Sequence, residues 1–188
     1  LRNADGSGVI AGITRICMVH GYVMSEGERQ PIPGQLIYRG YDINDIVNGC
    51  IKENRFGFEE VVWLLLFGDL PTESQLEGLR EVLGECRELP DEFVEDMIMK
   101  HASKDIMNKM GRSILALYSY DDFADENTLE GELKKALYTI ARMPVIMVNS
   151  YQAKIGHYDN ASTYYHPLRP EESMAESILS TLRPTREY

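Results

Sequence analysis

The sequence lacks any apolar run long enough to cross a lipid bilayer. Its longest extends only from Val61 to Phe67, whereas a membrane-spanning helix needs about 20 apolar residues. The first residues also lack the charged and apolar regions of a signal peptide. With 44% hydrophobic and 26% charged residues, the composition is typical of a soluble globular domain with no membrane partner.

Cysteine is scarce, and basic residues are outnumbered. Cys17, Cys50 and Cys86 are far apart and form no Cys-x-x-Cys pair, which argues against a disulfide framework or a zinc site and favours the reducing cytoplasm. The 19 basic residues are dispersed among 30 acids, giving a net charge of -11. A nucleic-acid partner is therefore not expected, because phosphate binding depends on clustered Lys and Arg.

The usual catalytic and phosphate-binding motifs are also missing. There is no Gly-x-Ser-x-Gly elbow, Walker loop or dinucleotide turn, and Gly6-Ser7-Gly8 indicates only a flexible turn. Adjacent acids are explained as helix-start charges or solvated loops. The histidines are too far apart for metal ligation, so we expect them to be solvated or hydrogen-bonded in loops: His20, His101, His157 and His166.

One arginine and a group of methionines could also have a functional role. Arg39 lies where a strand is expected to meet a helix, and there it could bind a carboxylate or phosphate. The favoured interpretation is a structural pair with Asp42 or Asp45. The methionines are expected to fill a core or an interface rather than act as ligands: Met97, Met99, Met107 and Met110.

Residues 1–40 predict a small extended region. β-branched stretches at Val9-Ile10 and Ile13 to Cys17, followed by Gly21 to Val23 and Leu36 to Tyr38, indicate a hairpin or two. The polar segment from Ser25 to Gly34 is expected to be a surface loop.

Residues 41–188 predict a helical region. Asp42 can cap a helix through Lys52, Phe58 to Phe67 should form a buried helix closed by Gly68, and Thr72 to Gln75 fits a capping box. Further helices are expected after Pro90, from Ser103 to Tyr118, from Thr128 to Lys154 with a kink at Pro144, and from Glu171 to Leu182. The predicted core face of the Ser103 helix is Ile106, Met107, Met110, Ile114 and Leu117. The fold class is therefore mainly α, with a small β element near the N-terminus.

Two sequence patterns resemble the start of citrate synthases. The segment Gln35 to Ile46 contains Tyr-Arg-Gly-Tyr-Asp-Ile, and Phe58 to Thr72 contains Phe-Glu-Glu-Val and ends in Gly-Asp-Leu-Pro-Thr. Leu1 to Val9 and Leu182 to Tyr188 also resemble segments of that family. The resemblance implies the N-terminal part of a large, multi-helix citrate synthase domain across residues 1–188.

Citrate synthases condense acetyl-CoA with oxaloacetate, using two His and one Asp, while further His and Arg residues hold the carboxylates. In family order these residues lie beyond the position of Tyr188. The resemblance therefore implies no catalytic, cofactor-binding or metal-binding residue here, and we expect an inactive fragment of an acyltransferase of the tricarboxylic acid cycle. It also implies a homodimer through helices near 103–118 and 128–154. His101-Ala102-Ser103 departs from the His-Pro-Met of many members.

Two alternatives stay open. A 2-methylcitrate synthase, which accepts propionyl-CoA, would share every feature above. A helical interaction module that kept a dimer surface and lost catalysis would also fit, and a gene that stopped near Tyr188 would favour it.

Overall fold

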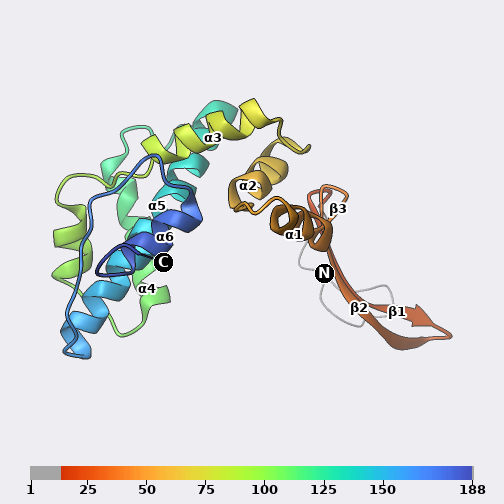
Figure 1. Ribbon diagram of the computed structural model, residues 1–188, viewed down its shortest axis with the longest axis horizontal. Helices are drawn as coiled ribbons and strands as arrows, with labels where there is room; N and C mark the ends of the chain where they lie inside the picture. The colour runs from red at the N-terminus through yellow and green to blue at the C-terminus, as the bar shows by residue number, and fades with distance from the viewer. Residues whose placement is uncertain (1–13, 188) are drawn as a thin grey trace. The chain divides into compact units, whose positions relative to one another are not determined.

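The computed structural model describes residues 14–187. The strand expected at Val9-Ile10, the turn at Gly6 to Gly8 and the family-like segment Leu1 to Val9 lie outside the described residues. The chain divides into two compact units, Leu1–Leu76 and Glu77–Tyr188. The expected mainly α architecture with a small N-terminal sheet is confirmed (Figure 1).

The first unit contains a three-stranded antiparallel sheet in the order β1-β2-β3. Strand β1 (Cys17–Ser25) pairs along its length with β2 (Glu28–Tyr38), and the short β3 (Tyr41–Asp42) pairs with the end of β2. Glu26 and Gly27 both have positive φ, 52° and 83°. A two-residue turn of this kind matches the twist of the strands that it joins, which fixes the hairpin register.

The expectation of a polar surface loop from Ser25 to Gly34 was wrong. Only Glu26 and Gly27 turn, because Glu28 already pairs with Ser25. His20 pairs with Gln35 and Tyr22 with Pro31, so Ile32 to Gly34 all face Gly21. This bulge lies in β2, and bulges are where a strand tolerates proline.

Two helices complete the first unit. Helix α1 (Ile43–Lys52) begins at Asp42, whose carboxylate accepts from the Asn44 backbone N–H, as expected. Helix α2 (Phe58–Phe67) ends at Gly68, which has φ 102°. The small core consists of Ile46, Cys50 and Leu64. Burial of α2 on all sides was wrong, since Phe58 and Phe67 are about half exposed.

Helix α3 (Glu73–Glu85) starts with the expected capping box. The Thr72 N–H donates to Gln75 Oε1 at 2.9 Å, and the Gln75 N–H donates to Thr72 Oγ1 at 3.3 Å. Leu79 and Leu83 are its buried apolar residues.

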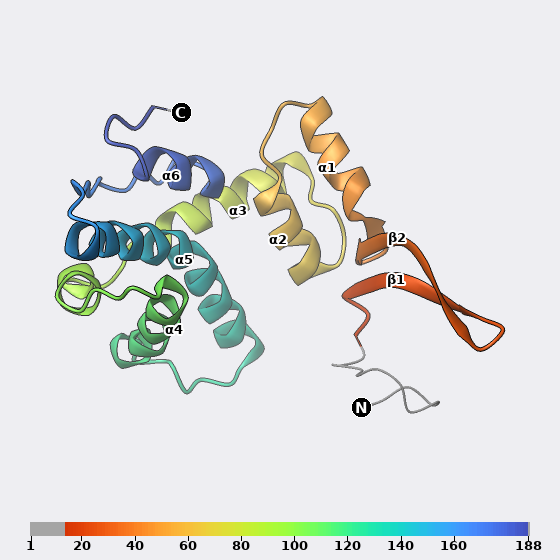
Figure 2. The same cartoon turned by 90° about the horizontal axis from the view of Figure 1, so that it is seen from below.

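The second unit packs around α5 (Leu129–Tyr158). The π-helix η1 (Val94–Met99), α4 (Ile106–Leu117) and α6 (Met174–Thr181) all contact α5, and the short η2 (Tyr118–Tyr120) follows α4. Phe93, Ile98, Ile146 and Ala153 form the buried core. Pro144 lies inside α5, which bends along its length (Figure 2).

Two details of the predicted helices were wrong. Helix α4 is capped by Asp105, whose side chain accepts from the Asn108 N–H, rather than by Ser103. Its inner face includes Lys109 and Ser113, while Met107 is 76% exposed. Met107 therefore lies away from the core that Met110 and Ile114 contact.

Within residues 14–187, no helix combines the length and apolar character that a bilayer crossing requires.

Candidate functional site

The four histidines do not come together. His20 lies in the hairpin, His101 and His157 are exposed, and His166 is half-buried in the segment before α6. Across the described part of the chain, no group of three His, Cys, Asp or Glu side chains could hold a metal ion. His166 is the histidine with the most defined contact, since its Nε2 lies 2.6 Å from the Arg183 carbonyl oxygen.

Arg39 has a structural role, but not with the expected partners. Its Nη2 donates to the Leu65 carbonyl in the last turn of α2 at 2.9 Å, where a cation also complements the helix dipole. Its backbone has φ 50° and its N–H donates to the Ile16 carbonyl at 2.8 Å. The expected pairing with Asp42 or Asp45 was therefore wrong, and Asp42 instead caps α1.

The three cysteines are free and have different surroundings. Cys50 is 8% exposed and lies beside Arg55 and Glu60, which form an ion pair. Burial raises the pKa of the Cys50 thiol, and it does the same for Cys86. Neither thiol is poised to be a nucleophile, because the reactive form is the thiolate.

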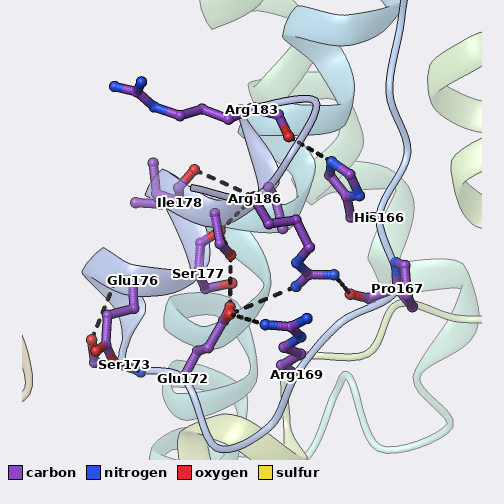
Figure 3. Close-up of polar contacts among 12 residues, drawn as sticks. His166, Pro167, Arg169, Glu172, Ser173, Glu176, Ser177, Ile178, Arg183 and Arg186 are labelled. Carbon is purple, nitrogen blue, oxygen red and sulfur yellow. Dashed lines mark hydrogen bonds and ion pairs between the residues drawn. The ribbon is translucent and has the colours of Figure 1, made fainter. Parts of the chain in front are cut away.

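A partly buried polar cluster surrounds Glu172, just before α6 (Figure 3). One carboxylate oxygen accepts from Ser180 Oγ at 2.8 Å, and the other lies 3.5 Å from Arg169 and 3.7 Å from Arg186. Arg186 also donates to the Pro167 carbonyl at 2.9 Å. The cluster therefore ties the segment before α6 to the residues that follow it.

Arg87 supports this cluster from the end of α3. Only 1% exposed, it donates to the carbonyl oxygens of Arg169 at 3.0 Å and Glu172 at 2.8 Å. Sequence analysis missed the cluster, although three arginines near the Glu171-Glu172 pair were a signal of an ion-pair network. Its groups hold one another, so the arrangement positions the backbone rather than moving protons.

Lys109 is another buried cation. It is 3% exposed, and its Nζ donates to the carbonyl oxygens of Met97, in the last turn of η1, and His101, just after it. Desolvation by burial lowers the pKa of Lys109, and the charge of Arg112 adds to the effect. Lys109 thus terminates the π-helix by supplying donors to its last carbonyls.

Two sizeable cavities lie among the described residues of the second unit. The larger, about 550 Å³, lies between α5 and the segment of η2 and residues 121–126, and Lys134 and Arg142 line it. Their charges lie 5.6 Å from the Phe123 ring and 4.6 Å from the Tyr138 ring, respectively. A groove of about 430 Å³ runs beside His166, Tyr165 and Glu95. Burial raises the pKa of the Tyr165 phenol above its ordinary value.

The fold and these clusters define a mainly helical protein with a small antiparallel sheet, whose polar groups mostly brace the backbone. The family model described as citrate synthase, C-terminal domain, matches residues 6–188. The chain belongs to the citrate synthase family.

Individual relatives agree with this assignment. Citrate synthase from Saccharolobus solfataricus is 30% identical over 165 residues, covering 87% of this chain and 39% of that protein. A 2-methylcitrate synthase from Shewanella oneidensis is 32% identical over 108 residues, covering 56% and 27%. The crystal structure of citrate synthase from Pyrobaculum aerophilum shares the fold with a TM-score of 0.72 at 22% identity, covering 100% of this chain and 45% of that one. The chain thus spans less than half the length of these relatives.

Proposed function

We propose that this chain is part of a citrate synthase, an acyltransferase that condenses acetyl-CoA with oxaloacetate to give citrate and CoA. The observation that carries the proposal is the family match across residues 6–188. The chain supplies helical scaffold, and the reacting groups belong to a part of the enzyme that it does not contain. The proposed location is the cytoplasm, where three free thiols persist in reduced form.

The chain alone is proposed to be inactive and to bind no cofactor. General acid–base catalysis needs a group within hydrogen-bond reach of the substrate proton, and the histidines described above lie apart from one another. Incubation of the purified chain with acetyl-CoA and oxaloacetate should release no CoA above background, with a full-length citrate synthase as positive control. Turnover abolished by His157→Ala or His166→Ala would contradict this.

A 2-methylcitrate synthase is the second candidate. The Shewanella relative of that name favours it, at an identity similar to that of the citrate synthase relative. Comparing acetyl-CoA with propionyl-CoA as substrates of the full-length enzyme would separate the two.

The proposed partner is a second copy, held through α4 and α5. A stripe of exposed residues along α4 and into η2 supports this, with Met107 at 76%, Leu115 at 77% and Tyr118 at 58% exposure, spaced as on one helix face. Met110, Ile114 and Leu117 pack onto the core of their own chain, so the exposed stripe is the part of the helix that we assign to the partner. Light scattering of Leu115→Glu should show a lower mass than the native chain, and an unchanged mass would contradict the interface.

A further inference from the structure

Among residues 14–187, strand β1 has a neighbour on one side only, so it forms an edge of the sheet. In the order β1-β2-β3, β1 is the outer strand, and β2 is the element that it contacts extensively in the described part of the chain. Natural edge strands are usually protected by charges, prolines or bulges. The segment Cys17 to Ser25 reads Cys-Met-Val-His-Gly-Tyr-Val-Met-Ser, with no Asp, Glu, Lys, Arg or Pro. The bulge lies on β2, so β1 itself runs regularly.

The side chains of β1 are as open as its edge. Met18 is 49% exposed, Val19 80%, Val23 38% and Met24 51%. In Figures 1 and 2 the ribbon of β1 and β2 extends away from α1 and α2. A lone two-stranded hairpin is marginally stable in water, so this one gains stability from any strand that pairs with its free edge.

The sequence of β1 is nearly symmetric about Gly21. Val19 and Val23 are equidistant from it, as are Met18 and Met24. When two copies of a strand pair antiparallel about a two-fold axis, residues equidistant from the centre lie opposite each other. Centred on Gly21, such pairing places valine opposite valine and methionine opposite methionine, and sets His20 opposite the aromatic ring of Tyr22.

Electrostatics favour the same partner. The chain has a net charge of -11, so two copies repel at most of their surfaces, whereas β1 brings no acid against an acid. Arg29, on β2, lies over the Tyr22 ring of its own chain at 4.8 Å, within the hairpin. A Cβ at Gly21 would meet no atom within 4 Å, so the backbone at the centre is open to approach.

We propose that β1 pairs edge to edge with β1 of a second copy of this chain, antiparallel and centred on Gly21, to form one continuous sheet. This interface is distinct from the α4–α5 surface and independent of the catalytic assignment. Where both interfaces form, the assembly is larger than a dimer.

Disulfide trapping tests the register. The proposed pairing puts the native Cys17 opposite Ser25 of the second copy, so Ser25→Cys creates two symmetric cross-links between copies. Within one chain these residues lie at opposite ends of β1, about 26 Å apart at roughly 3.3 Å per residue, far beyond the Cα separation of about 7 Å that a disulfide spans. Gln30→Cys is the matched control, because Gln30 lies on β2, away from the free edge.

Under mild oxidation, Ser25→Cys should run mostly as a disulfide-linked dimer that a reductant reverses, and Gln30→Cys should not. Equal cross-linking in the two variants would overturn the proposal, as would none in either.

A charge tests the edge without any cysteine. Val19→Lys should halve the mass measured by light scattering, because a lysine on the edge blocks strand pairing. Gln30→Lys adds the same charge to β2 and should leave the mass unchanged. Val19 is 80% exposed, so the hairpin itself should tolerate the change, and an unchanged circular dichroism spectrum is the check. A native mass for Val19→Lys, as expected if residues 1–13 or another partner cover the edge, would overturn the proposal.

Discussion

The two units of the chain achieve order by different means. The first relies on neighbours in sequence: a hairpin with a two-residue turn, a capped helix and the small core of Ile46, Cys50 and Leu64. The second relies on residues far apart. Its core joins Phe93 and Ile98 to Ile146, and Arg87 bonds to carbonyls 82 and 85 residues further along.

This difference decides which fold elements can be identified from the sequence. A fold element specified by local contacts carries its signal in a short motif, such as Tyr38 to Ile43 or the helix ended by Gly68. An element specified by distant contacts depends on pairs that no short window contains. A substitution in the buried core of the second unit should therefore have the largest effect on stability.

The largest effect is expected from Phe93→Ala. Phe93 is fully buried and meets the Tyr120 ring edge-on at 5.4 Å, so its truncation should lower the free energy of unfolding by about 3–5 kcal/mol. Urea denaturation followed by circular dichroism measures this. Leu129→Ala, at a residue 89% exposed, is the control and should change stability by less than about 0.5 kcal/mol. Similar losses in the two variants would show that the second core is not where the structure places it.

The next effect is expected from Arg87→Met, which keeps the packing of the stem and removes the guanidinium. The carbonyls of Arg169 and Glu172 then lose buried donors, at a cost of about 2–4 kcal/mol for the pair. Hydrogen exchange should accelerate in the segment before α6. Arg112→Met, at an exposed residue, is the control and should leave exchange in that segment unchanged. Equal exchange in the two variants would show that Arg87 does not hold the segment in place.

Much of the fold was predictable because local chemistry decided it. The Asp42 cap, the Gly68 end and the Thr72 capping box depend on residues at most three positions away. Each satisfies backbone groups that a helix end leaves open. The boundaries of α1 and α2 were therefore correct to the residue.

The rest depended on tertiary contacts. Nothing near Lys109 in sequence shows that it faces inward, since a lysine in a helix is normally solvated. Its burial follows from the carbonyls that η1 turns toward it. The contacts of Arg39 and Glu172 could not be predicted from the sequence for the same reason. Sequence proximity suggested Asp42 for Arg39, whereas the acceptor lies on the next helix but one.

A smaller effect is expected in the first unit from Glu60→Gln. Glu60 pairs with Arg55, whose pKa is raised chiefly by its hydrogen bonds to Glu60 and Glu53. Without that charge the stability should fall by about 1 kcal/mol, since the pair is partly solvated. Fluorescence of Trp63, one turn along α2, reports the loss. Glu53→Gln, at the exposed partner, should have a weaker effect, and a reversed order would contradict the assignment of the pair.

The smallest expected effect is a change in how stability varies with pH, and it concerns Lys109. Burial lowers its pKa in the folded chain, while the unfolded chain keeps a value of about 10.4. Between these two pKa values the unfolded state binds more protons, so the stability of the native chain rises with pH there.

Lys109→Met removes this contribution. Urea denaturation across alkaline pH should therefore show the native chain gaining stability relative to Lys109→Met as the pH approaches the ordinary lysine value. Lys104→Met is the control, because Lys104 is exposed and lies over the Tyr158 ring at 5.4 Å; its profile should run parallel to that of the native chain. If the profiles of both variants run parallel to the native one, Lys109 is solvated and η1 ends by other means.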